Sequence, residues 1–368
     1  MKKFIIALLK KITYLIPKKN NRVCFKSFPD YSGNAIAVYE YMKKNTDYEL
    51  IWLIDNEIKP KIGAKKSKSI SGLWTFFRAK YIITTHNDFV SISPSNQIYI
   101  SLWHGMPLKK IGYTGNEHIG MKSISALRIS TSELTRSLIS ASFNEPANNV
   151  FITGQPVCDK LFSQKKISDF FDVPNDVRKV IFYLPTFRQD FNEKKIEGRK
   201  VSSHNIFRFD KYNHHEFIKY LEYEKILLIV KLHPAEECYL NEIEENGYFK
   251  FIKSKDIDLY DVLAVADSLI TDYSSVYIDY LILDRPLAFV VPDKEQYIQS
   301  RNGFTLEPYD DWTPGNKIIS VSDLFNFIDM LSSGQDNYKN DRQRVKRIMH
   351  RYDDDQNSKR VFDMLIKR

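Results

Sequence analysis

The chain has 368 residues, of which 43% are hydrophobic and 14% aromatic, and its formal net charge is +8. This composition excludes a chain that is disordered throughout, and the length favours two domains over one. The positive charge suggests an anionic partner, such as nucleic acid, an acidic membrane surface or a phosphorylated substrate, with plain solubility as the alternative.

The first predicted element is an amphipathic helix that ends before Pro17. The residues expected on its apolar face are Met1, Phe4, Ile5, Leu8, Leu9, Ile12, Leu15 and Ile16. Those expected on the opposite face are Lys2, Lys3, Lys10 and Thr13. No apolar run approaches the roughly 20 residues that span a bilayer. We therefore expect residues 1–20 to lie in the plane of an anionic membrane surface, with docking on the protein itself as the alternative.

Strand-like and helix-like segments alternate through the rest of the chain. The predicted strands are Val23–Phe28, Glu49–Ile54, Tyr81–Thr85, Gln97–Trp103, Val150–Thr153, Val180–Leu184, Ile226–Leu232, Ser268–Thr271 and Leu287–Val291. The predicted helices are Asn34–Lys43, Ser123–Ser142, Ser274–Leu283, Ser322–Ser332 and Tyr338–Ile366. The polar stretch Gln189–Asn213 has no clear period and is expected to form a long loop.

The strands are continuous apolar runs, such as ILLIV and LAFVV. Runs of this kind are typical of parallel strands that helices cover on both faces. Two such series predict an α/β fold with two doubly wound parallel sheets. We expect one domain at residues 21–155, a second at 156–335, and a C-terminal helical segment at 336–368.

Polar residues follow four of the predicted strands. They are His104 and Gly105 after IYISLW, Arg188 at the end of FYLPTFR, Lys231 and His233 in LLIVKLHP, and Thr271, Asp272, Ser274 and Ser275 in SLITDYSS. Ligands of open parallel sheets bind beyond the carboxyl ends of the strands. The four runs together therefore predict ligand sites, although each run alone is a weak signal.

The residues of the second series suit a phosphate group. Serine and threonine before an apolar helix cap its free N–H groups, and the same N–H groups bind phosphate. Arg188 can contact two phosphate oxygens, and His233 can donate to a third. Each has a structural alternative: capping alone for the serines, a surface ion pair for Arg188, and a packed structural histidine for His233.

His104 belongs to the first series and is a candidate general base that takes a proton from an acceptor hydroxyl. Gly105 permits a positive φ angle or a close approach. Lys109 and Lys110 either attract an anionic acceptor or are simply solvated. The sequence has no metal-binding motif, no phosphate-binding glycine loop and no paired cysteine spacing, so no metal or cofactor is expected.

The segments FPDYSGNA, LWHGMPLKKIG, LPTFR, KLHP and ITDYSSVYIDYLILDRPLAF together resemble the CDP-glycerol glycerophosphotransferases of teichoic acid synthesis. The resemblance runs from about Phe25 to Gly315. It implies a GT-B fold, with the donor nucleotide in the C-terminal Rossmann-like domain and the acceptor at the N-terminal one. It implies transfer of glycerol phosphate from CDP-glycerol to a lipid-linked saccharide, with release of CMP.

Carried over by motif, the resemblance makes His104 the proposed base, with His233 as the second catalytic residue and as the alternative base. It implies that Arg188, Lys231, His233, Thr271, Ser274 and Ser275 hold the donor diphosphate, while Asp272 orients its loop. The residues implied on the acceptor side are Asp30, Ser32, Asn34, Gly105, Lys109 and Lys110. At the cytoplasmic face of the cell membrane, the N-terminal helix would bring such an enzyme to a polyprenyl-diphosphate-linked acceptor.

One departure leaves the substrates open: Val157 stands in TGQPVCDKLF where the family usually has arginine. The short chain favours a primase acting on ManNAc-GlcNAc-diphospho-undecaprenol, because polymerases commonly carry an extra N-terminal region. Another acceptor, a capsule polysaccharide or CDP-ribitol as donor are alternatives. Other classes are a GT-B nucleotide-sugar glycosyltransferase and a membrane-associated binding protein, while no nucleic-acid-binding module is indicated.

Overall fold

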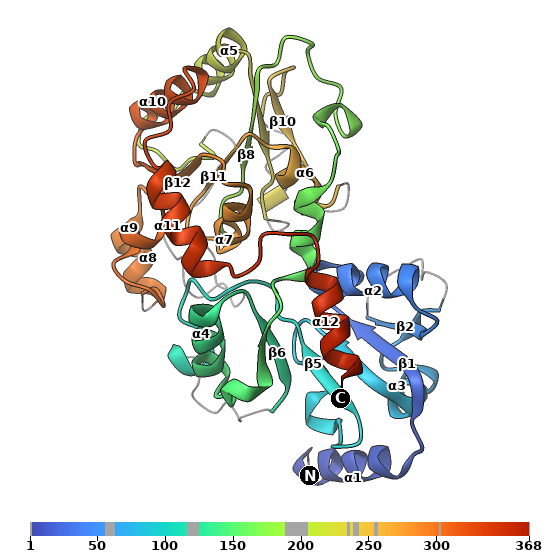
Figure 1. Ribbon diagram of the computed structural model, residues 1–368. Coiled ribbons are helices and arrows are strands. Elements are labelled where there is room, and N and C mark those ends of the chain that lie inside the picture. The colour runs from blue at the N-terminus through green and yellow to red at the C-terminus, as the bar shows by residue number, and fades with distance from the viewer. Residues whose placement is uncertain are drawn as a thin grey trace. The chain divides into compact units, whose positions relative to one another are not determined.

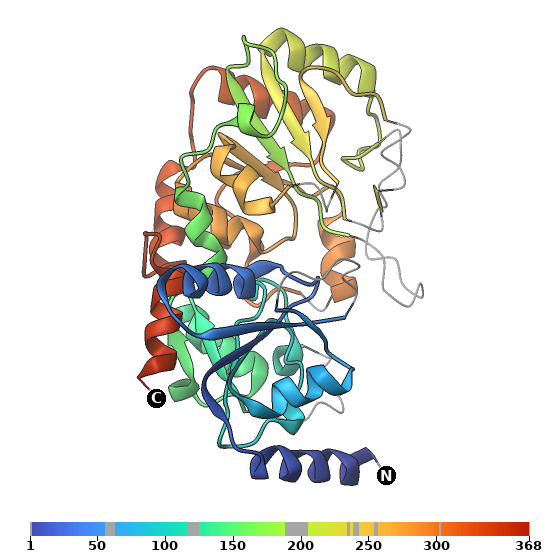
Figure 2. The same ribbon diagram turned by 90° about the vertical axis from the view of Figure 1, so that its right-hand side faces the viewer.

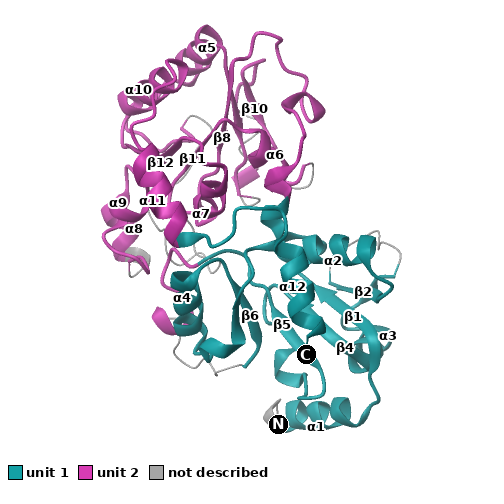
Figure 3. Cartoon of the chain, in the orientation of Figure 1, with its two compact units in different colours: residues 1–106, 117–159, 349–368 teal, residues 107–116, 160–348 magenta. Residues whose placement is uncertain are grey.

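The computed structural model describes residues 2–55, 63–115, 125–187, 205–233, 236–237, 243–253, 257–301 and 303–367. The chain forms two compact units (Figure 3). Unit 1 comprises Met1–Met106, Glu117–Asp159 and Met349–Arg368, and unit 2 comprises Pro107–Asn116 and Lys160–Ile348. Both chain ends therefore belong to unit 1, and the chain enters unit 2 twice.

Unit 1 is built on a parallel sheet of seven strands in the order β3-β2-β1-β4-β5-β6-β7 (Figure 1). The strands are β1 (Lys19–Lys26), β2 (Glu49–Ile54), β3 (Lys65–Lys66), β4 (Ala79–Thr84), β5 (Ile98–Ser101), β6 (Leu127–Ser130) and β7 (Val150–Ile152). The α-helices described in this unit are α1 (Lys2–Leu15), α2 (Gly33–Asn45), α3 (Ile70–Arg78), α4 (Glu133–Phe143) and α12 (Asn357–Ile366).

Unit 2 has a parallel six-stranded sheet in the order β10-β9-β8-β11-β12-β13. The strands are β8 (Lys179–Tyr183), β9 (Ile226–Val230), β10 (Phe249–Phe251), β11 (Ser268–Thr271), β12 (Leu287–Val290) and β13 (Asn316–Ile318). The α-helices described here are α5 (His214–Glu224), α6 (Leu259–Val265), α7 (Val276–Tyr280), α8 (Lys294–Arg301), α9 (Tyr309–Trp312), α10 (Val321–Ser332) and α11 (Lys339–Met349).

Both sheets follow the doubly wound order 3-2-1-4-5-6 when strands are counted within each unit, with β7 added at one edge of unit 1. The predicted fold class is thus confirmed. The order reverses between β1 and β4 in unit 1, and between β8 and β11 in unit 2. In such sheets the crevice beyond the carboxyl ends at the reversal is the usual ligand site.

The central strand β1 of unit 1 is buried on both faces over Arg22–Lys26. Val23 and Phe25 point into a cluster with helices α2 and α12, whereas Cys24 between them points into a second cluster with α3 and α1. This alternation places one hydrophobic layer on each side of the sheet. It fixes the positions of the strand ends that hold the polar residues.

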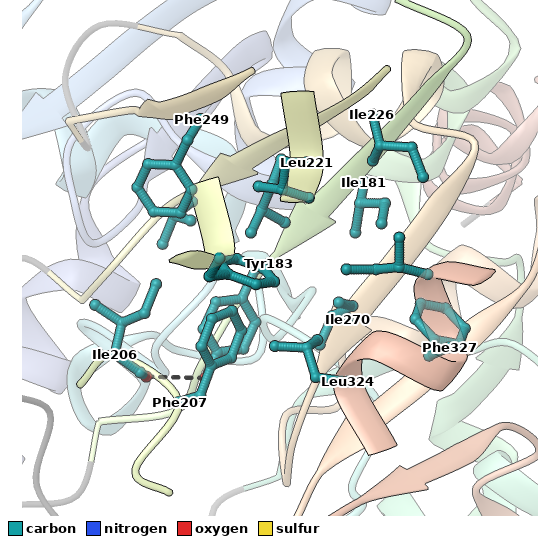
Figure 4. Close-up of a cluster of buried hydrophobic side chains, with 14 of the residues drawn as sticks. Ile181, Tyr183, Ile206, Phe207, Leu221, Ile226, Phe249, Ile270, Leu324 and Phe327 are labelled. Carbon is teal, nitrogen blue, oxygen red and sulfur yellow. Dashed lines mark hydrogen bonds between the residues drawn. The ribbon is translucent and has the colours of Figure 1, made fainter. Parts of the chain in front are cut away.

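The core of unit 2 includes part of the predicted long loop (Figure 4). Ile206, Phe207 and Phe209 are buried there, and Phe207 stacks on Tyr183 with ring centroids 4.7 Å apart. The Tyr183 hydroxyl donates a hydrogen bond of 3.2 Å to the Ile206 carbonyl (Figure 4). Asn205–Asn213 is therefore irregular but packed, while residues 189–204 of this loop lie outside the described residues.

Two helix predictions were wrong in part. Within Ser123–Ser142, residues 123–124 lie outside the described residues, Leu127–Ser130 form strand β6, and the helix described here is Glu133–Phe143. The predicted helix Tyr338–Ile366 is two helices, α11 and α12. The chain is not helical between Met349 and Asn357, where three consecutive aspartates, residues 353–355, lie.

Helix α1 divides its apolar surface between the protein and solvent. Ile6 and Leu9 pack against the α3 side of unit 1, while Phe4, Leu8, Ile12 and Leu15 are exposed. Thr13 is fully buried, so its predicted place on the polar face was wrong. Figure 2 shows α1 along one end of unit 1, next to α3. Among the residues that the structure describes, no helix is both long enough and apolar enough to cross a bilayer.

Candidate active site

His104 lies just beyond strand β5, at the carboxyl edge of the unit 1 sheet. The chain turns sharply on both sides of it, since φ is +57° at Trp103 and +150° at Gly105. Glycine adopts the latter angle without the strain that a Cβ atom causes. The His104 ring stacks on that of His86, with centroids 4.5 Å apart and planes 14° apart. Its other close neighbour is Trp103, at 4.0 Å between centroids.

Although the His104 side chain has an exposed surface, its surroundings lower its pKa to about 4. Partial burial is the main cause and the neighbouring His86 is the second, while a hydrogen bond with the Thr85 backbone acts in the opposite direction. The pKa of His86 is lowered as well, mainly by burial. Both imidazoles are therefore neutral near pH 7, which is the state that a general base requires.

The FPDYSGNA segment supports the loop that precedes His104. Asn34 is buried, and its side-chain amide donates to the Trp103 carbonyl at 3.2 Å, while its Oδ1 accepts from the Val157 backbone N–H at 3.1 Å. Asp30 accepts from the Asp55 backbone N–H at 3.0 Å, and Ser32 donates to the Pro29 carbonyl at 2.5 Å. Asn34 thus acts as a support, whereas Asp30 and Ser32 stay partly open to solvent.

Asp272 lies at the point of unit 2 where the strand order reverses. It is fully buried and accepts from the Thr186 backbone N–H at 2.8 Å and from the Thr186 hydroxyl. These bonds join the ends of β8 and β11, as a residue that orients a loop must do. Arg208 is buried beside them, donates to the Thr186 carbonyl at 3.0 Å, and places Nη1 3.7 Å from the Asp272 carboxylate.

Sequence analysis missed Arg208, because it lies in an irregular segment without a strand or helix pattern. Its apolar neighbours Phe207 and Phe209 were the available signal. Three large buried residues in a row, with one arginine among them, indicate a packed segment around an internal charge.

Lys231 and His233 follow β9, the strand beside β8. The His233 ring stacks on Phe187, with centroids 4.5 Å and planes 16° apart. Burial lowers the pKa of both Lys231 and His233. The charge of Lys231 adds to the effect on His233, and Glu237 opposes it. A neutral imidazole and a nearby ammonium group thus stand at the same edge of the sheet.

The other predicted donor-site residues differ in accessibility. Thr271 is fully buried and its hydroxyl donates to the Leu184 carbonyl at 2.7 Å. Ser274 and Ser275 are half-buried at the start of α7. Arg188 lies outside the described residues. Strands β9, β8 and β11 are neighbours, so their ends bring Lys231, His233 and the two serines to one edge.

Lys109 and Lys110 belong to unit 2 in the structure, although the resemblance implies an acceptor role. Lys109 forms an antiparallel bridge with Phe304, and the Thr305 N–H donates to the Leu108 carbonyl at 2.8 Å. The Lys110 ammonium lies 3.4 Å from Glu307. The two lysines therefore lie beside the segment that begins at Phe304, and their contact with an acceptor stays a prediction.

A cavity of about 1150 Å³ in unit 2 lies away from these residues. Its lining includes Lys165, Arg178 and Asp267, near the amino ends of the strands. Ligands of doubly wound sheets bind at the opposite edge, so we do not assign the donor to it. Within the described ranges, no three histidine, cysteine, aspartate or glutamate side chains come together in a way that could hold a metal ion.

The sequence model of one family, CDP-glycerol:poly(glycerophosphate) glycerophosphotransferase, matches residues 8–367. The chain belongs to this family. Its membership confirms the resemblance seen in the sequence motifs and identifies the chain as a glycerophosphotransferase.

Named relatives of this glycerophosphotransferase act in teichoic acid synthesis. A teichoic acid poly(glycerol phosphate) polymerase of Bacillus spizizenii is 27% identical over 368 residues, which cover 92% of this chain and 89% of the relative. A teichoic acid glycerol-phosphate transferase of Staphylococcus aureus is 27% identical over 387 residues, covering 97% and 95%. A structure of a variant of the wall teichoic acid polymerase TagF matches with a TM-score of 0.79 at 21% identity, over 99% of this chain and 92% of that one.

These comparisons bear on two expectations for the glycerophosphotransferase. The TagF match confirms the GT-B fold class. The argument from length does not separate a primase from a polymerase, because this chain covers 89% of a relative that is named a polymerase.

Proposed function

We propose that this glycerophosphotransferase transfers glycerol phosphate from CDP-glycerol to a hydroxyl group of a lipid-linked saccharide in teichoic acid synthesis. The observation that supports this most is the family match over residues 8–367. Within it, unit 1 supplies a neutral histidine, and unit 2 supplies an ammonium group, an imidazole and two hydroxyls at a ligand-binding edge.

In the proposed reaction, His104 takes the proton of the acceptor hydroxyl as its oxygen attacks the phosphorus that bears glycerol. The bond between this phosphorus and the bridging oxygen breaks, and CMP leaves with the electron pair. Lys231 and His233 stabilise negative charge that grows on the diphosphate, together with the hydroxyls of Ser274 and Ser275. Asp272 keeps the loop after β8 in place through Thr186.

The acceptor that we propose is ManNAc-GlcNAc-diphospho-undecaprenol, which would make the enzyme a primase. The exposed apolar side chains of α1 support a membrane-bound acceptor, because they suit an enzyme that lies on the cytoplasmic face of a bilayer. Val157, which contributes its backbone N–H to Asn34, is compatible with this acceptor and with others.

The test is incubation of the purified chain with CDP-glycerol and the synthetic lipid-linked disaccharide, with CMP and the extended lipid product measured together. Parallel reactions contain CDP-ribitol or UDP-N-acetylglucosamine as donor. We expect CMP and product only with CDP-glycerol, and a loss of about 10²-fold or more in His104→Ala. Release of UDP, or transfer from CDP-ribitol alone, would contradict the proposed donor.

A further inference from the structure

His86 is a second histidine at the carboxyl edge of unit 1, and it follows β4, which lies next to the reversal of strand order. Three groups hold its ring. Its Nδ1 lies 2.7 Å from the Thr85 hydroxyl, Phe28 packs edge-on with centroids 5.8 Å apart, and His104 stacks on it at 4.5 Å. A ring held in this way presents a fixed plane to His104.

We propose that His86 is a positioning residue for His104: it fixes the plane of the His104 imidazole and keeps the stacked pair from holding two protons. The proposal rests on the proposed function, in which His104 is the base. It adds a residue that the sequence motifs did not indicate.

The physical basis is the short distance between the two rings. Two positive charges 4.5 Å apart repel each other, so protonation of either imidazole opposes protonation of the other. The pair therefore binds one proton more readily than two. Because His86 is neutral, its charge does not oppose protonation of His104 when His104 accepts the proton of the acceptor hydroxyl. The stacked neutral ring then lies against the imidazolium that forms.

Charged groups around the pair come from two strand ends. Lys26, at the end of β1, disfavours a proton on His86, whereas Asp88, two residues after His86, favours it. Lys26 is buried and its ammonium lies 2.6 Å from Asp55, which offsets part of its charge. Burial raises the pKa of Asp88. The aromatic neighbours Phe28 and Trp103 are uncharged.

Arg128 supports the pair on both sides. Its Nη1 donates to the Asn87 side chain at 3.1 Å, next to His86. Its guanidinium lies 4.0 Å above the Phe143 ring, which packs against Trp103 at 4.7 Å, next to His104. One buried cation thus braces the residues beside both histidines, as fixed ring planes require.

The experiment compares His86→Ala and His86→Phe with His215→Ala, a control at an exposed histidine of unit 2. The pKa of His104 is measured by NMR titration of the intact chain without substrate, with the signal assigned from His104→Ala. CMP release is measured from pH 5 to 9, and circular dichroism checks folding.

We expect both His86 variants to raise the pKa of His104, because each removes the neighbouring proton site. His86→Phe keeps an aromatic partner for His104, so its rate of CMP release at pH 7.5 should stay within about threefold of the parent rate. In His86→Ala the His104 ring loses this partner and its fixed orientation, so the rate should fall about tenfold. The control should change neither quantity.

Two results would overturn the proposal: an unchanged His104 titration in both folded variants, or a full parental rate in His86→Ala. The titration needs no turnover, so it tests the pair even if the proposed donor or acceptor is wrong. If His86→Ala does not fold, His86→Phe still tests the shared proton.

Discussion

At the scale of single residues, the surroundings of His104 predict an unusual pH dependence. Its pKa is lowered to about 4, so the imidazole stays ready to accept a proton well below the ordinary histidine pKa of roughly 6.5. We expect kcat/KM for CMP release to stay level from pH 8 to about 5 and to fall only below that. An acid limb near pH 6.5 would contradict this assignment.

The same shift affects stability in a defined direction. Between the ordinary pKa and the lowered one, the unfolded chain binds a proton at His104 that the folded chain does not bind. This group therefore stabilises the unfolded state as pH falls from roughly 6.5 to about 4. The free energy of urea unfolding of the parent should therefore fall relative to that of His104→Ala as pH decreases through this range, and a constant difference would argue against the shift.

Loss of the Asp272 carboxylate should destabilise unit 2. Replacement by asparagine removes one of two carboxylates beside buried Arg208, the other being Glu236 at 3.8 Å, and weakens the bonds from Thr186. Breaking a buried ion pair on one side costs about 3 kcal/mol. Urea unfolding should show a loss of this order in Asp272→Asn, while Asp172→Asn, at an exposed position, should match the parent. Equal stability of the two variants would show that the ion pair between Asp272 and Arg208 does not stabilise the fold.

At the scale of elements, long apolar runs were predicted well and mixed ones were not. The buried strands β8, β9, β11 and β12 have continuous apolar sequences, which sheet burial on two faces demands. Strand β6 lies within a segment predicted as helix, and Arg128 interrupts its short apolar run. That arginine is buried in a strand only because Glu145 and Phe143, which are distant in sequence, accommodate it.

Helix α1 shows both the use and the limit of periodicity. Its amphipathic pattern predicts the helix itself, but not which part of the apolar face docks on unit 1. Thr13 lies one helical turn after Leu9, which packs against the unit 1 cluster of Phe76, and the Thr13 hydroxyl donates to the Leu9 carbonyl. The side of α1 that docks is set by this cluster of unit 1, so a helical wheel alone assigns Thr13 to the wrong side.

The exposed part of α1 predicts binding to anionic bilayers. Leu8 is 47% and Ile12 is 39% exposed, and α1 has no acidic residue to repel the lipid. The double variant Leu8→Glu, Ile12→Glu should bind vesicles of phosphatidylglycerol and phosphatidylcholine about tenfold more weakly, because two apolar contacts are lost and two negative charges are added. Cosedimentation measures this directly.

The double variant Tyr223→Glu, Ile319→Glu is the matched control, since Tyr223 is 78% and Ile319 is 61% exposed and both lie in unit 2. Like the α1 variant, it adds two negative charges at exposed side chains. Equal loss of vesicle binding in the control would show that net charge, rather than the face of α1, determines the association.

At the scale of the whole molecule, one topological rule explains which site residues the sequence could predict. Parallel strands present their carboxyl ends at one edge, so residues just after strands, such as His104, His233 and Asp272, could be grouped without coordinates. His86 follows the same rule, since it comes two residues after the end of β4. Arg208 could not be found in this way, because it approaches Asp272 from a packed irregular segment.

The proposed direct displacement also predicts the stereochemistry at phosphorus. One attack by the acceptor oxygen inverts the configuration, whereas a phosphorylated histidine followed by a second attack restores it. His233 makes the second route a real competitor, since burial lowers its pKa and leaves a neutral, nucleophilic imidazole beside Phe187. CDP-glycerol with a chiral phosphorothioate at the transferred phosphorus distinguishes them. We expect inversion, because the proposed reaction has a single attack at phosphorus, and net retention would show that a covalent intermediate forms.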